Sequence, residues 1–126
     1  MKRLFLLLSL LLCFTTASLA QAIIKTDKTV HNFGKVTSDK PVSCTFVFTN
    51  TGKEPLVLNQ VYSNCGCTVS NFTKEPVESG KTGKITVTYN GKGRFPGHFK
   101  NPITVRSNAA NGLVRIYIEG NLIVKD

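Results

Sequence analysis

The sequence of 126 residues contains no tryptophan, a single methionine and only seven acidic side chains. Beyond the first twenty residues, no stretch of ten or more residues repeats apolar side chains at helical spacing. We therefore expect no helical bundle and no redox motif at a helix N-terminus. The carboxylates are scattered singly, and no serine, histidine and aspartate form a recognisable nucleophile pattern. These absences predict that the protein is not an enzyme.

One long apolar run is present, and it lies near the N-terminus. A pair of basic residues precedes Leu4–Leu12, which is shorter than the roughly 20 residues that span a bilayer. Small side chains at Ser18 and Ala20 then suit cleavage by a signal peptidase. We expect residues 1–20 to be an export signal and residues 21–126 to be one domain, periplasmic or secreted.

Basic residues outnumber acidic ones by 16 to 7, and removal of the expected signal leaves 14 to 7, a formal charge of +7. A charge of this sign favours acidic partners. The basic residues are scattered singly, however, and form no run that resembles a nucleic-acid tail. We expect a protein or an envelope polymer as the partner and no nucleic acid, with the oligomeric state left open.

The remaining chain alternates apolar and polar residues with a period of two. Between Val42 and Thr49, for example, Cys44, Phe46 and Phe48 share one face, which is typical of a half-buried strand. The pattern predicts an all-β, immunoglobulin-like, two-sheet antiparallel β-sandwich of about seven strands, with a small barrel as the alternative. The tryptophan and the cysteine spacing of antibody domains are absent. The expected strand segments cover residues 22–25, 29–36, 42–49, 56–62, 68–70, 84–90, 99–107 and 113–124.

Three finer expectations concern the connections. Turn residues at 50–53 predict a simple hairpin that would pair Cys44 with roughly residue 59. Residues 71–78 are expected to form a polar loop, and Gly120 is expected to mark a bulge or kink in the last strand. The glycines and cations of residues 91–97 are expected to form a connection between strands rather than a phosphate loop, because no helix follows them.

Three cysteines follow the expected signal: Cys44, Cys65 and Cys67. Cys44 lies on the apolar face of its strand, so we expect it to behave as a small buried hydrophobe. The other two form the motif Cys65-Gly66-Cys67, and they are the candidate thiol pair. The flanking residues Asn64 and Thr68, together with Gly66, are expected to support the turn.

The motif has three interpretations. In the first, the thiols form a reducible disulfide that exchanges with exported proteins; a straight strand separates residues i and i+2 by about 6.5–7 Å, so a tight turn at Gly66 is required. In the second, the thiolates bind copper(I) or zinc, although two sulfurs are too few for a closed zinc site and His31 and His98 are distant in sequence. In the third, which we favour, the pair is structural. No neighbouring residue in the sequence clearly lowers a thiol pKa.

A second candidate site lies on the last two long strands. If these strands pair, four basic side chains decorate one exposed sheet surface: His98, Lys100, Arg106 and Arg115. Such a surface suits an anionic glycan or phosphate. A charged coat that resists aggregation is the alternative interpretation, and it is the one that we favour.

Several segments together resemble a bacterial family, the domain of unknown function 1573, which is similar to immunoglobulin-like domains of the major-sperm-protein and Hydin type. The central segment is Cys65-Gly66-Cys67-Thr68, and Ser79 departs from the family pattern, which has proline there. The resemblance implies an exported immunoglobulin-like module and no assigned activity. The other matching segments are Asn32–Gly34, Phe46–Gly52, Pro55–Leu56, Gly80, Gly83, Ile85–Tyr89, Gly97–Phe99 and Val105–Asn108.

The sequence therefore predicts a non-enzymatic binding or accessory module of the cell envelope, without a cofactor, that contacts its partner through a strand edge or the loops. The alternative is a thiol-disulfide exchange or copper(I)-handling protein that acts through Cys65 and Cys67.

Overall fold

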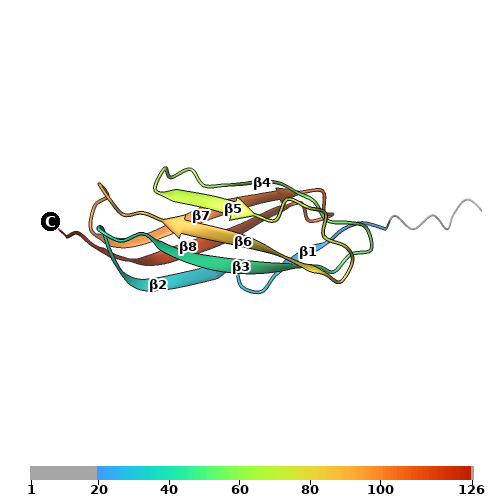
Figure 1. Ribbon diagram of the computed structural model, residues 1–126, viewed down its shortest axis with the longest axis horizontal. Helices are drawn as coiled ribbons and strands as arrows, with labels where there is room; N and C mark the ends of the chain where they lie inside the picture. The colour runs from blue at the N-terminus through green and yellow to red at the C-terminus, as the bar shows by residue number, and fades with distance from the viewer. Residues whose placement is uncertain (1–19, 126) are drawn as a thin grey trace, which may run out of the picture.

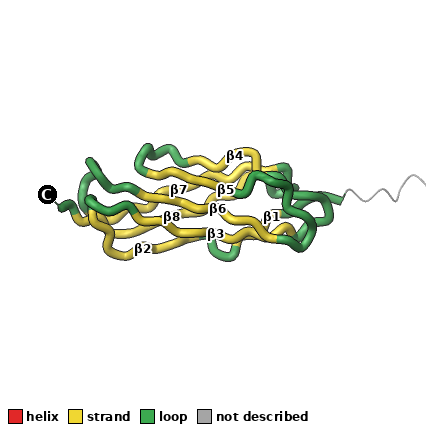
Figure 2. The backbone as a smooth tube through the Cα atoms, viewed as in Figure 1, coloured by secondary structure: helices red, strands yellow, loops and turns green. Residues whose placement is uncertain are grey.

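The computed structural model describes residues 20–125, and these fold as two four-stranded sheets packed face to face (Figure 1). Residues 1–19, which carry most of the expected export signal, lie outside the described residues. Strands and loops make up the whole described chain (Figure 2), which contains no helix long and apolar enough to span a membrane. The strands are β1 (Ile24–Thr26), β2 (Val30–Thr37), β3 (Val42–Asn50), β4 (Leu58–Tyr62), β5 (Thr68–Phe72), β6 (Thr82–Tyr89), β7 (Gly97–Ser107) and β8 (Leu113–Ile123).

The first sheet has the order β1-β3-β6-β5 and is antiparallel throughout, whereas the second has the order β2-β8-β7-β4. The expected immunoglobulin-like sandwich is confirmed. It has eight strands, and one pairing differs from the antiparallel expectation, because β2 runs parallel to β8. Two parallel strands that pair need a long connection between them. Here that connection consists of β3 to β7.

The core lies between the sheets and follows from the alternation. Phe46 and Phe48 on β3 are fully buried, as are Ile85 and Val87 on β6, which pairs with it. The opposite sheet contributes Ile103 and Val105 from β7 and Ile116 and Ile118 from β8. Each fully buried side chain of this size contributes about 1.5–3 kcal/mol.

The hairpin expected around residues 50–53 is wrong. The chain leaves β3 in one sheet and enters β4 in the other, so Cys44 lies opposite Val87 of β6 rather than near residue 59. The reason is Asn50, which is fully buried. Its Nδ2 donates to the carbonyls of Glu54 (2.7 Å) and Val77 (2.9 Å), and these bonds hold the turn across the end of the sandwich.

Two further expectations need correction. The bulge lies in β2 and not at Gly120, because Asn32 is opposite Glu119 whereas Lys35 is opposite Asn121. Gly34, with φ of 70°, takes up the extra residue. Gly120 instead makes room for an aromatic ring, since an added Cβ would lie 2.9 Å from Phe99 Cζ. The expected polar loop also begins too early, because β5 extends to Phe72.

Candidate functional site

The Cys65-Gly66-Cys67 motif lies in the connection between β4 and β5, where the chain crosses from the second sheet to the first. The β6–β7 connection lies beside it, and the backbone N–H of Asn90 donates to the carbonyl of Cys67 at 2.8 Å. We call this end of the sandwich the cysteine end. It comprises the connections 63–67 and 90–96, the turn 38–41 and the chain after β8 (Figure 1).

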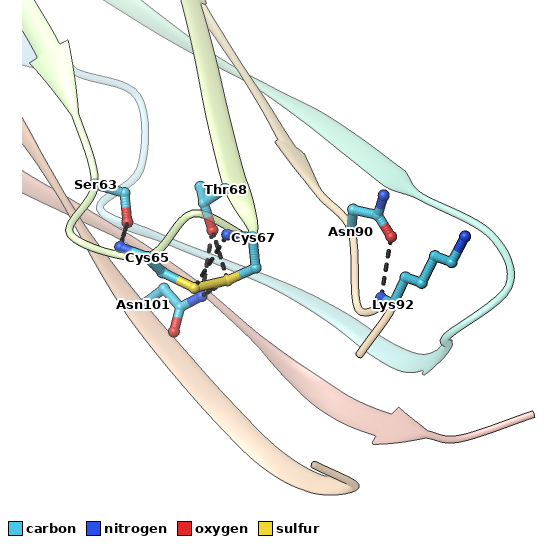
Figure 3. The surroundings of a disulfide bond; sticks show 7 residues. All are labelled: Ser63, Cys65, Cys67, Thr68, Asn90, Lys92 and Asn101. Carbon is cyan, nitrogen blue, oxygen red and sulfur yellow. Dashed lines mark hydrogen bonds between the residues drawn. A yellow bond between two sulfur atoms is a disulfide. The ribbon is translucent and has the colours of Figure 1, made fainter. Parts of the chain in front are cut away.

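Cys65 and Cys67 are joined by a disulfide within a tight turn (Figure 3). Their Cα atoms are 5.2 Å apart, shorter than the extended spacing of residues i and i+2 and within the range of protein disulfides. The N–H of Thr68 donates to the carbonyl of Cys65 at 3.2 Å, and this bond closes the turn. The turn that the sequence required for a disulfide is therefore present.

The expected supporting residues contribute unequally. Thr68 is buried beside the disulfide, whereas Asn64 is exposed. The Oγ of Ser63, which the sequence did not single out, accepts the N–H of Cys65 at 3.3 Å. Gly66 does not have a positive φ, so the turn does not depend on its conformational freedom. An added Cβ at Gly66 would meet only Arg94 Nη2, at 4.0 Å.

Asn101 is a further residue at this site that sequence reasoning missed. It comes from β7, and its Nδ2 donates to Cys67 Sγ at 3.5 Å and to Thr68 Oγ1 at 3.3 Å (Figure 3). Because a disulfide sulfur carries no hydrogen, the Thr68 hydroxyl is the donor in its 3.6 Å contact with Cys67 Sγ. The available signal was an amide at an inward position of β7, between Phe99 and Ile103.

A shallow, open hollow of about 360 Å³ lies against the turn. Cys65 and Gly66 line one side, and Arg94 of the β6–β7 connection lines another; Ser63, Asn64, Asn101 and Pro102 complete it. The sequence did not single out Arg94, and the fold brings this cation to the same hollow as Cys65. The N–H of Lys92 donates to Asn90 Oδ1 at 3.0 Å and shapes this connection (Figure 3).

The histidines do not join the cysteines. His98 lies 3.3 Å from a carboxylate oxygen of Glu119, and His31 lies 2.9 Å from Lys28 Nζ. The pKa of His31 is lowered, first by burial and then by the Lys28 charge. Within residues 20–125, no three or more His, Cys, Asp or Glu side chains gather as a metal site would require.

Cys44 is the free cysteine of the described chain, and it is buried as expected. Burial raises the pKa of its thiol, and the Lys28 charge opposes that shift. A buried thiol with a raised pKa is mostly protonated near neutral pH and is a weak nucleophile. This cysteine therefore belongs to the core and not to the site.

The basic surface predicted on the last strands is the outer face of β7 and β8, which pair in antiparallel register. His98, Lys100, Arg106 and Arg115 all lie on it, but so does Glu119, directly opposite Lys100. Binding of an anionic partner there stays a prediction.

Two tyrosines also belong to this basic surface. Lys100 Nζ lies 5.2 Å from the centre of the Tyr117 ring. Tyr62 of β4 lies opposite Thr104, and the pKa of its phenol is lowered by hydrogen bonds from Arg106 and then Thr104.

Comparison with known proteins identifies a family whose function is unknown. Residues 24–122 match the family described as "Protein of unknown function (DUF1573)". No curated protein matches the chain.

Solved structures with 10–16% sequence identity share the fold. A Porphyromonas gingivalis W83 protein of unknown function has a TM-score of 0.71 and 16% identity; the match covers 86% of this chain but only 51%, about half, of that one. PapD-like domain 7 of human CEP192 has a TM-score of 0.67 and 10% identity, over 89% of this chain and 93% of the domain. The periplasmic chaperone SfaE has a TM-score of 0.57 and 10% identity, over 82% of this chain and 59% of the chaperone chain.

Proposed function

The chain belongs to the DUF1573 family of proteins of unknown function, and we propose that it is an exported, non-enzymatic module that binds a partner protein through its cysteine end. The single observation that carries this proposal is the exposure of Phe95, at 94%, in the β6–β7 connection. Aromatic residues and arginine are both enriched at protein interfaces, and Arg94 precedes Phe95 in the chain.

The apolar groups around Phe95 support the same surface. Six large apolar side chains are exposed in the described residues, and four of them lie at or next to the cysteine end: Val69, Phe95, Ile123 and Val124. Exposed apolar residues are ordinary when scattered singly and informative when they gather. Three cations, Lys92, Arg94 and Lys125, line a second hollow of about 450 Å³ at this end, together with Val124 and one carboxylate, Asp39. The fitting partner is a protein that presents apolar and acidic side chains.

The likeness to SfaE, a periplasmic chaperone, supports only the fold and its suitability for binding other proteins. Export rests on the N-terminal sequence. Export is tested by intact-mass measurement of the protein recovered from the cell envelope. A chain that begins after Ala20 supports export, and an uncleaved cytoplasmic chain contradicts it.

Site-specific photocrosslinking tests the binding surface. A photoreactive phenylalanine analogue placed at Phe95 should yield one discrete crosslinked product in intact cells, and Arg94→Glu should weaken it. The same analogue at Leu113, which is also exposed but lies at the opposite end, is the matched control. Equal labelling from both positions, or none from Phe95, would refute the proposed surface.

A second candidate function, thiol-disulfide exchange, is favoured by one specific observation: Cys65 lines an open hollow together with Arg94. A reducible disulfide needs access for an attacking thiolate, and a neighbouring cation favours that anion. Thiol trapping across defined glutathione buffers tests it. We expect Cys65 and Cys67 to titrate together while the fold persists. A disulfide that resists reduction until the protein unfolds would exclude this function.

A further inference from the structure

The two cysteines of the disulfide differ in exposure. Cys65 is partly buried and lines the hollow beside Arg94. Cys67 is only 7% exposed and packs with the core. A thiolate must contact the sulfur that it attacks, so access favours Cys65.

The two sulfurs also differ in their hydrogen-bond donors. Cys67 Sγ accepts from two side chains, Asn101 Nδ2 and the Thr68 hydroxyl, at 3.5 and 3.6 Å. Cys65 Sγ accepts one bond, from the backbone N–H of Cys67 at 3.3 Å. Donors that point at a sulfur stabilise its thiolate and lower its pKa, and a thiol of lower pKa is the better leaving group.

We propose that thiol-disulfide exchange at this site has a fixed direction, in which Cys65 Sγ is attacked and Cys67 leaves as the thiolate. This inference rests on the second candidate function given above. The attacking group is a thiolate of a partner protein. It forms a bond to Cys65 Sγ while the Cys65–Cys67 bond breaks, and the electron pair of that bond stays on Cys67 Sγ.

The step is completed by a second thiol of the same partner. Its thiolate attacks the partner's own sulfur in the mixed disulfide, and Cys65 departs as a thiolate. The partner is oxidised to a disulfide, and Cys65 and Cys67 are reduced. The two protons that the partner thiols lose are taken up by the two cysteine sulfurs. The substrate class is therefore an exported protein with two neighbouring thiols.

Asn101 is a positioning residue in this scheme, because it acts through Cys67. Thr68, whose oxygen accepts from Asn101 while its hydrogen points at Cys67 Sγ, relays the same effect. A side chain at position 66 would fit and would project toward Arg94. Because Gly66 has no side chain, the hollow between Arg94 and Cys65 stays open to a reactant.

The direction is tested first with glutathione as the probe. Glutathione disulfide is added to reduced, folded Cys67→Ser and Cys65→Ser variants, and the adduct is followed by intact mass. At a pH where both thiols are ionised, we expect the adduct at Cys65 to form about tenfold faster than the adduct at Cys67, because the lower thiol pKa of Cys67 then gives it no advantage and access decides the rate. In the unchanged protein, acid quenching during reduction should trap glutathione on Cys65. Equal rates, or an adduct on Cys67, would overturn the proposed direction.

The role of the donors is tested with Asn101→Ala and Thr68→Val. Each should slow reduction of the disulfide by glutathione, by about tenfold for Asn101→Ala, because the leaving thiolate loses a hydrogen-bond donor. Each should also raise the thiolate pKa of Cys67, measured by the pH dependence of thiolate absorbance in the reduced protein. Asn121→Ala, at an exposed position of β8, is the matched control.

The outcomes separate the inference from the function on which it rests. Unchanged rates and an unchanged Cys67 pKa in both variants would refute the role of the donors. A disulfide that no glutathione buffer reduces in the folded protein would refute exchange itself. A disulfide that is readily reduced but carries glutathione on Cys67 would refute only the direction.

Discussion

Asn50 is a position at which a single substitution should strongly destabilise this fold. Its side chain is fully buried and uses its whole hydrogen-bonding capacity. Nδ2 donates to the carbonyls of Glu54 and Val77, while Oδ1 accepts the N–H of Gly52 at 3.0 Å and of Ile23 at 3.3 Å. One amide therefore ties together the start of β1, the turn after β3 and the segment before β6.

The magnitude follows from the groups that Asn50→Ala would leave without partners. The bonds to Val77 and Gly52 are buried, so water cannot replace them. An unsatisfied buried donor or acceptor costs about 1–3 kcal/mol, so the two groups together cost about 2–6 kcal/mol. This is a large part of the 5–15 kcal/mol that stabilises a typical domain.

The assay is urea denaturation followed by circular dichroism, which gives the free energy of unfolding. Asn121→Ala serves as the matched control, because Asn121 is exposed on β8 and should change stability by less than about 0.5 kcal/mol. A loss below about 1 kcal/mol for Asn50→Ala, with native cooperativity, would show that the buried amide does not hold the connection as described.

Three further predictions concern the core and the basic surface. Gly83→Ala should destabilise by about 1–3 kcal/mol in the same assay, because the Phe48 ring fills the space of an added Cβ; a neutral effect would contradict this packing. Cys44 should resist alkylation until the protein unfolds. Because burial raises the pKa of Cys44, its contribution to stability is full below the ordinary value of 9.0 and is lost as pH rises through the folded-state pKa. The urea concentration at the unfolding midpoint should therefore decrease when the pH is raised above 9.0. The Tyr62 phenol should ionise early in an ultraviolet pH titration, and Arg106→Met should raise its pKa toward 10.0; an unchanged titration would exclude the hydrogen bond.

Local pattern was enough to predict the fold class. The alternation along β3 correctly puts Cys44, Phe46 and Phe48 in the core, because successive side chains of a strand point to opposite faces. Turn residues correctly mark where β3 ends near Asn50. The same pattern could not indicate which strands pair. A hairpin between β3 and β4 and a crossing between sheets at that point are compatible with the same turn residues, and the tertiary structure shows the crossing, with Asn50 buried beneath it.

The candidate site divides in the same way. The sequence by itself determined the thiol pair, the need for a turn between the two cysteines and the inward position of Cys44. These depend on covalent spacing and on strand periodicity, which are local properties. Only the tertiary structure decided that Arg94 stands beside Cys65 and that Asn101 donates to Cys67. Both side chains come from segments that follow β6, and they reach the motif because two sheets close face to face at one end. Proximity between distant segments depends on strand order and packing, and no local pattern records it.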